Sequence, residues 1–194
     1  TLVMDLNPGT AAAMPRRFMV AGDKLYVTAV DPINGWELWC TDGTPGGTQM
    51  VLDINPGFTS TTVFPYGEVD GKLIFIATDP AFGSEPWVSD GTALGTVMLM
   101  DIEPGPTSSY GNVLGMHAGE LYFWGRNDAL GQELYKTDGT PSGTMLVLDI
   151  EPGERSSTPF HFVSTGSRWA YFAATTDITN RELWRTDGTP ANTT

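Results

Sequence analysis

Short apolar segments separated by glycine-rich turns run along the whole chain. The clearest unit contains the run Leu-Ile-Phe-Ile-Ala at residues 73–77, which is typical of a buried strand. Asp70-Gly71 stands just before this run and is a strong signal for a tight hairpin turn. The pattern therefore predicts four strands in this unit, at residues 63–69, 72–78, 85–89 and 96–102.

The same four-strand plan recurs in the rest of the chain. In the first unit it predicts strands at residues 18–22, 25–30, 37–41 and 48–54. No segment shows a helical period with caps. Four aspartates of a second repeated phrase stand 48 residues apart, at Asp5, Asp53, Asp101 and Asp149. A fixed period of this length, with four short strands in each repeat, is typical of the blades of a β-propeller.

The two ends of the chain indicate how the blades would close. Residues 1–6 contain Leu-Val-Met-Asp-Leu, the pattern of a fourth strand, and the last unit holds only the first three strands. We therefore expect an all-β, four-bladed β-propeller with four antiparallel strands per blade, in which the N-terminal strand completes the last blade. The prediction is a single domain, residues 1–194, with a closing strand at 1–6 and blades at 7–54, 55–102, 103–150 and 151–194. A piece of a longer array, or half of an eight-bladed dimer, also fits the pattern.

Composition narrows the classes of partner. The chain has 194 residues, a formal net charge of −13 and only 10 basic residues, which argues against binding to nucleic acid because phosphate contacts need clustered Lys and Arg. No apolar run approaches the ~18 residues of a membrane span, so we expect no membrane insertion. Cys40 is the one cysteine, so neither an intrachain disulfide nor a thiolate metal cluster is expected. The acidic surface would attract cations.

The phrase Glu-Leu-Trp-x-Thr-Asp-Gly-Thr occurs four times with small changes, beginning at Glu37, Glu85, Glu133 and Glu182. Together with four copies of Asp-Ile/Leu-x-Pro-Gly, it resembles the bacterial ELWxxDGT repeat family, which occurs in large extracellular proteins. The resemblance covers essentially the whole chain and implies propeller-like repeats in a secreted or cell-surface protein of a bacterium. By architecture the chain is also similar to hemopexin-type four-bladed propellers, although the hemopexin motifs and closing disulfide are absent.

Three positions of the repeated phrase are assigned to the frame of the blades. The aromatic ring fills the wedge between sheets, a buried glutamate must be hydrogen-bonded, and aspartate before Gly-Thr stabilises a tight turn. Two alternatives are sugar-stacking platforms for the aromatic rings and catalytic carboxylate pairs, as in glycosidases, for the glutamates. The positions are Glu37, Trp39 and Asp42, then Glu85, Trp87 and Asp90, then Glu133, Tyr135 and Asp138, and finally Glu182, Trp184 and Asp187.

Function is expected at positions that the repeat leaves free. In a propeller, the loops between the second and third strands emerge on the same face as the linkers between blades. On that face we predict ligand contacts by Trp36, Phe82, Asp31, Asp79, Asp128 and Asp177. The rim residues Asp5, Asp53, Asp101 and Asp149 are predicted to hold calcium in each blade, since hard cations need many oxygen ligands. The alternative is that each of these aspartates caps its own Pro-Gly turn. The hemopexin resemblance also implies an ion on the central axis.

These observations predict a non-catalytic binding or scaffold module whose ligand is a glycan or another protein. Loops on a rigid frame are where such proteins place recognition, and four similar blades would give repeated sites that suit multivalent binding. The first alternative is a structural module that associates with its own copies into a surface layer or filament. The second is an enzyme of the hydrolase class, but His117 and His161 stand outside any recognisable catalytic motif.

Overall fold

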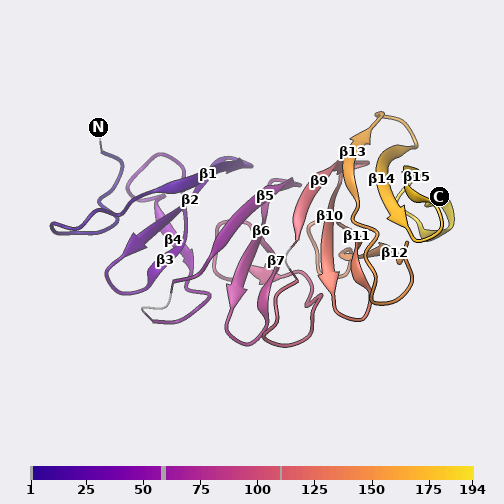
Figure 1. Ribbon diagram of the computed structural model, residues 1–194. Helices are drawn as coiled ribbons and strands as arrows, with labels where there is room; N and C mark the ends of the chain where they lie inside the picture. Colours follow the sequence, from indigo (N-terminus) through magenta and orange to yellow (C-terminus); the bar gives the residue numbers. More distant parts are fainter. Residues whose placement is uncertain (1, 58–59, 110) are drawn as a thin grey trace.

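Four antiparallel β-sheets follow one another along the chain in the computed structural model, which describes residues 2–57, 60–109 and 111–194. The sheets stand side by side in a curved row, with the two termini at opposite ends (Figure 1). The only helical element among the described residues is the 3-10 turn Pro190–Asn192. The predicted all-β class and the four repeated sheets are therefore confirmed.

Each sheet is a meander whose strand order is the sequence order. The first sheet contains β1 (Arg16–Ala21), β2 (Lys24–Asp31), β3 (Gly35–Thr41) and β4 (Gln49–Leu52). The second contains β5 (Val63–Val69), β6 (Lys72–Asp79), β7 (Gly83–Ser89) and β8 (Val97–Met98). The third contains β9 (Asn112–His117), β10 (Glu120–Asn127), β11 (Gly131–Thr137) and β12 (Met145–Leu148). The fourth contains β13 (Phe160–Ser164), β14 (Ala170–Thr176) and β15 (Asn180–Thr186).

The predicted ring closure is not shown by the structure. Residues 2–6 lie outside the strands, and the fourth sheet contains three strands. Arg185 on β15 exchanges two backbone hydrogen bonds with Thr194, at 2.8 and 3.0 Å, so the position of a fourth strand is occupied there by Thr194 and not by the N-terminal segment. The segment 2–6 lies at the far end of the row, beside the first sheet (Figure 1).

The hydrophobic core consists of layers between neighbouring sheets. The motif aromatic residue of each later sheet packs toward the sheet before it: Trp87 lies between the first and second sheets, Tyr135 between the second and third, and Trp184 between the third and fourth. Trp39 packs with Leu6 and Met50 on the outer side of the first sheet. The motif ring therefore joins one repeat to the next.

One predicted strand is much shorter than expected. The sequence predicts a strand at 96–102, but β8 is limited to Val97–Met98. Pro86, on the neighbouring strand, has no backbone N–H and can only accept, which it does from the N–H of Leu99 at 2.8 Å. The ladder between β7 and β8 ends there because its next donor is missing.

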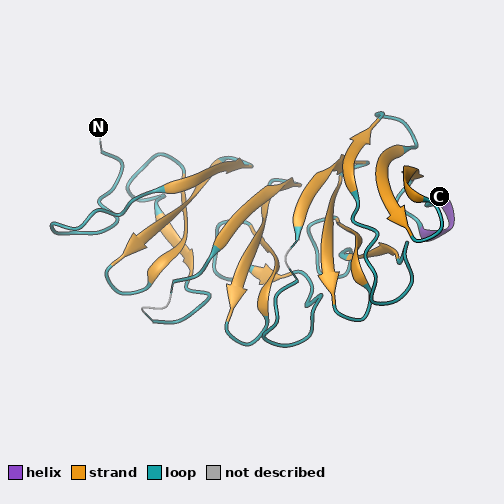
Figure 2. Ribbon diagram, in the orientation of Figure 1, coloured by secondary structure: helices purple, strands orange, loops and turns teal. Residues whose placement is uncertain are grey.

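The loops between the second and third strands of each sheet lie along one edge of the row, together with the linkers that precede β5, β9 and β13 (Figure 2). We call this edge the loop face. Glycine is required at the β6–β7 loop, because Gly83 has a φ of +73° and a Cβ there would lie 2.6 Å from the carbonyl oxygen of Thr107 in the next linker. In the fourth sheet Asn180 takes the equivalent position with a φ of +57°, which asparagine tolerates better than most residues.

Candidate functional site

A buried glutamate ties each of the first three sheets to the linker that follows it. Glu85 has no exposed surface and accepts hydrogen bonds from the backbone N–H groups of Ile102, at 3.0 Å, and Ser109, at 3.1 Å. Glu133 does the same with Ile150 and Ser157, and Glu37 accepts from Thr61. Glu182, in the fourth sheet, is exposed. The motif glutamate thus fixes the path of the chain between repeats.

Burial raises the pKa of Glu37, Glu85 and Glu133 to about 7, because the charged carboxylate loses its hydration. The charge of a neighbouring aspartate adds to the increase, while the N–H donors oppose it. A carboxyl group with such a pKa can mark an acid or base catalyst when it faces a cleft. Here each glutamate is fully buried and bonded to the backbone, which suits a structural role.

The motif aspartates build the turn before the fourth strand. Asp42 accepts hydrogen bonds from the N–H and the hydroxyl of Thr44, at 2.8 and 2.7 Å. The same pair of bonds recurs at Asp90, Asp138 and Asp187. A Cβ on Gly47 would lie 2.1 Å from the Asp42 carboxylate, so the second glycine of the phrase leaves room for this carboxylate.

The predicted ligand residues of the loop face lie in separate loops. Asp31 accepts from the N–H groups of Ile33 and Asn34, at 2.7 and 2.8 Å, and hydrogen bonding from this turn lowers its pKa although burial opposes the shift. Asp79 accepts from Ala81 in the same way, Asp128 pairs with Arg126, and Asp177 pairs with Arg155. The structure therefore does not bring these four carboxylates together.

The two predicted aromatic contacts also differ in their surroundings. Trp36 is half-buried, and the guanidinium of Arg16 lies 3.6 Å from its ring centroid. Phe82 is exposed at the tip of the β6–β7 loop. Neither side chain lines the cavity described below.

The predicted calcium rim contains oxygen atoms without partners. Oδ1 of Asp53, Asp101 and Asp149 is buried and finds no hydrogen-bond donor among the described residues. Asp5 accepts from the N–H of Asn7 at 3.2 Å. Over residues 2–57, 60–109 and 111–194, no three His, Cys, Asp or Glu side chains come together in a way that could hold a metal ion. Calcium binding at these positions stays a prediction.

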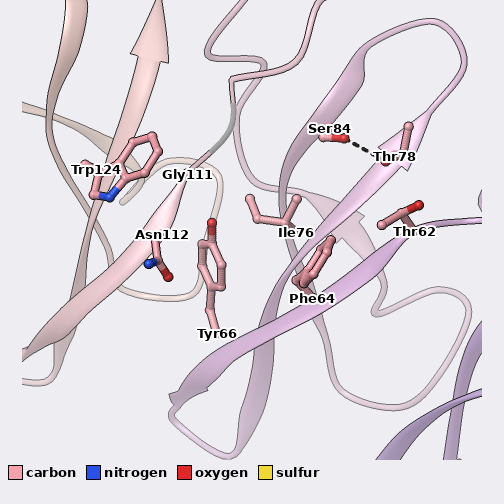
Figure 3. Close-up of a pocket in the computed structure, with 9 residues that line it drawn as sticks. All are labelled: Thr62, Phe64, Tyr66, Ile76, Thr78, Ser84, Gly111, Asn112 and Trp124. Carbon is pink, nitrogen blue, oxygen red and sulfur yellow. Dashed lines mark hydrogen bonds between the residues drawn. The ribbon is translucent and has the colours of Figure 1, made fainter. Parts of the chain in front are cut away.

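A cavity of about 570 Å³ opens between the second and third sheets, near the loop face (Figure 3). The second sheet contributes aromatic, aliphatic and hydroxyl side chains, and the third contributes an indole, an amide and a glycine. The lining residues are Thr62, Phe64, Tyr66, Ile76, Thr78, Ser84, Gly111, Asn112 and Trp124. Aromatic walls with a few polar groups and this volume are typical of small-molecule sites.

Tyr66 is directed into the gap between the sheets by a β-bulge. Pro65 pairs with Phe75 and Gly67 pairs with Ile74, so Tyr66 is the extra residue of β5. Its hydroxyl is buried and has no hydrogen-bond partner among the described residues. The phenol is protonated at neutral pH, and burial raises its pKa further, so Tyr66 keeps an unused donor.

Gly111 makes room for this arrangement. A Cβ at Gly111 would lie 2.7 Å from the carbonyl oxygen of Trp124 and 3.0 Å from the hydroxyl of Tyr66. Figure 3 shows Tyr66 between its own sheet and the side chains of Asn112 and Trp124 across the gap. None of these residues stands out as a site residue in the sequence. A comparison of repeats could have pointed to Trp124, because the equivalent positions hold Thr28, Ile76 and Ala173.

Comparisons with known proteins give little guidance. No family model matches the chain, and no curated protein matches it. Among solved structures, the chain is similar to a crystal structure titled as a putative exo-β-1,3-galactanase from Bifidobacterium bifidum s17, with 13% identity and a TM-score of 0.38. The likeness covers 88% of this chain and 65% of that one. At this level it carries no argument about function.

Proposed function

We propose that the protein is a non-catalytic glycan-binding module whose site is the cavity between the second and third sheets. The observation that carries this proposal is that one cavity contains both the Trp124 indole and a Tyr66 hydroxyl without a hydrogen-bond partner. The cavity lies near the loop face, where the sequence predicts ligand contacts. The resemblance to repeats of extracellular proteins fits a glycan as partner.

The chemistry of the lining suits a sugar. A pyranose ring has apolar C–H faces that pack on aromatic rings and hydroxyl groups around its rim that need hydrogen bonds. Phe64 and Trp124 offer aromatic surface. Tyr66 and Asn112 offer a phenol O–H and an amide that can donate and accept.

A non-catalytic role agrees with the groups available. The lining contains no carboxylate, imidazole, amine or thiol, and its hydroxyl groups belong to Thr62, Tyr66, Thr78 and Ser84. The hydroxyl oxygens of Thr78 and Ser84 lie 2.6 Å apart and are hydrogen-bonded to each other. His117 is buried, with its ring nitrogens bonded to the Ser164 hydroxyl and the Arg168 carbonyl. Neither arrangement places a general base beside a free nucleophile.

The proposal is tested by presenting the purified chain to an array of immobilised glycans, with a variant whose cavity is blocked, Gly111→Leu, as the control. We expect binding to a restricted set of sugars by the native chain and loss of that binding in Gly111→Leu. If the native chain binds none of the glycans on the array, the proposal is contradicted.

A further inference from the structure

The geometry points to one sugar site per chain, selective for an uncharged sugar residue, even though the frame repeats four times. This inference rests on the proposed glycan-binding function and deepens it by naming the ligand class and the number of sites. It departs from the expectation of several equivalent sites.

The Tyr66 phenol has no equivalent in the other three repeats. Tyr66 is the bulged residue of β5, and the corresponding positions in the other first strands are Phe18 and Leu114, with Phe162 in the fourth sheet. Phenylalanine and leucine place apolar groups there and supply no hydrogen-bond donor. A buried O–H without an acceptor costs free energy, so the Tyr66 phenol, which borders the cavity, is free to donate to a hydroxyl group of a bound ligand.

The wall of the cavity that faces Tyr66 contains the Trp124 indole. Trp124 on β10 pairs with Leu134 of the motif, and the residues in the same register are Thr28, Ile76 and Ala173. Only one of the four positions carries an indole. Since Trp124 belongs to the third sheet and Tyr66 to the second, both line a cavity only at this junction.

The absence of a side chain at Gly111 leaves space between Tyr66 and Trp124. Gly111 stands immediately before β9, and the residues in the same register are Pro15, Val63 and Pro159. A side chain at this position would meet both the Tyr66 hydroxyl and the Trp124 backbone. Three independent departures from the repeat therefore coincide at one cavity.

The lining of the cavity contains no charged side chain. The one ionisable group among the nine lining residues is the phenol of Tyr66, which is uncharged at neutral pH. Arg17, which reaches the outer part of the lining, lies over the Phe64 ring at 3.6 Å from the centroid and donates to the Val63 carbonyl. On a chain of net charge −13, a uronate carboxylate would lose hydration in the cavity, and the Arg17 guanidinium already stacks on Phe64 and donates to Val63. A neutral hexose meets neither penalty.

The test is isothermal titration of the native chain with neutral gluco-, galacto-, manno- and N-acetylglucosamine oligosaccharides and, in parallel, with oligogalacturonate. We expect one site per chain for at least one neutral sugar and at least tenfold weaker binding of the uronate. Trp124→Ala should weaken binding of the neutral sugar at least tenfold. Tyr66→Phe, which keeps the shape of the ring, should weaken it about fivefold without lowering the melting temperature.

The matched control is Phe18→Leu, which changes the repeat equivalent of Tyr66 outside the cavity and should bind as the native chain does. If a neutral sugar binds with more than one site per chain, if the uronate binds better, or if Trp124→Ala and Tyr66→Phe bind normally, the inference is wrong while the proposed function stands. If no sugar of either kind binds, the proposed function fails and the inference fails with it.

Discussion

At the residue scale, the hydrogen-bonded turn that begins at Asp42 ends in two neighbouring glycines, Gly46 and Gly47, whose surroundings differ. Gly47 lies against the Asp42 carboxylate, whereas a Cβ on Gly46 would meet open space. The Asp42 carboxylate can move away from a new methyl group only by losing its bonds to Thr44. The adjacent glycines are therefore an internal test of the turn.

Gly47→Ala should lower the free energy of unfolding by about 1–2 kcal/mol, because two hydrogen bonds of ~1 kcal/mol each are disturbed. Gly46→Ala should change it by no more than about 0.5 kcal/mol, as for most surface substitutions. Urea denaturation followed by tryptophan fluorescence measures both. Equal effects of the two substitutions would show that the carboxylate does not hold the turn.

The cavity residues show why part of the site escaped prediction. Glycines and aspartates of the turns have sequence signals of their own, because few other residues fit a positive φ or cap a turn. Tyr66 and Trp124 stand in strands whose aromatic residues otherwise fill the core, so their pattern predicts packing. What separates them is a bulge in β5 and the register between two sheets, and neither is visible in an apolar run.

At the scale of elements, the first three strands of the second sheet agree closely with the predicted strands, whereas the fourth strand and the linker after it differ from the prediction. The predicted strand at 63–69 coincides with β5, and that at 72–78 is one residue shorter than β6 (Lys72–Asp79). The fourth strands are shorter than predicted, since residues after β4 and β8 turn into linkers held by buried glutamates. Because burial raises the pKa of these glutamates, we expect the stability of the protein to depend on pH.

The free energy of unfolding should fall as the pH rises from 5 to 8. The pKa of Glu85 is about 7 in the folded chain, above its unfolded value of about 4.3, so the folded state binds more protons between these values. The stabilisation is complete below pH ~4.3 and is lost as the pH rises through about 7. Glu37 and Glu133 act in the same direction.

Melting temperatures measured from pH 5 to 8 check this expectation. Glu85→Gln should reduce the dependence on pH, because one of the three titrating groups is removed. Glu182→Gln, which changes the exposed copy of the motif, is the control and should keep the slope of the native chain. A slope that is unchanged in Glu85→Gln would contradict the account.

At the scale of the whole molecule, the structure is a row of sheets and not a closed ring. The segment 2–6 and β15 lie at opposite ends of the row, so the N-terminal segment does not complete the fourth sheet (Figure 1). No described helix is long and apolar enough to cross a membrane. The sequence predicted the number of sheets, because the period specifies the unit, but a period cannot specify how far successive units rotate.

The central claim is that a glycan binds beside Trp124, and the chain offers a direct measurement of it. The six tryptophans give six indole N–H signals in a ¹⁵N-labelled sample, and Trp124→Phe assigns the one of interest. On titration with the neutral oligosaccharide bound most tightly, we predict a saturable shift of the Trp124 signal, with the other five signals little changed. A shift confined to Trp36 or any other indole, or no shift at a saturating sugar concentration, would contradict the claim.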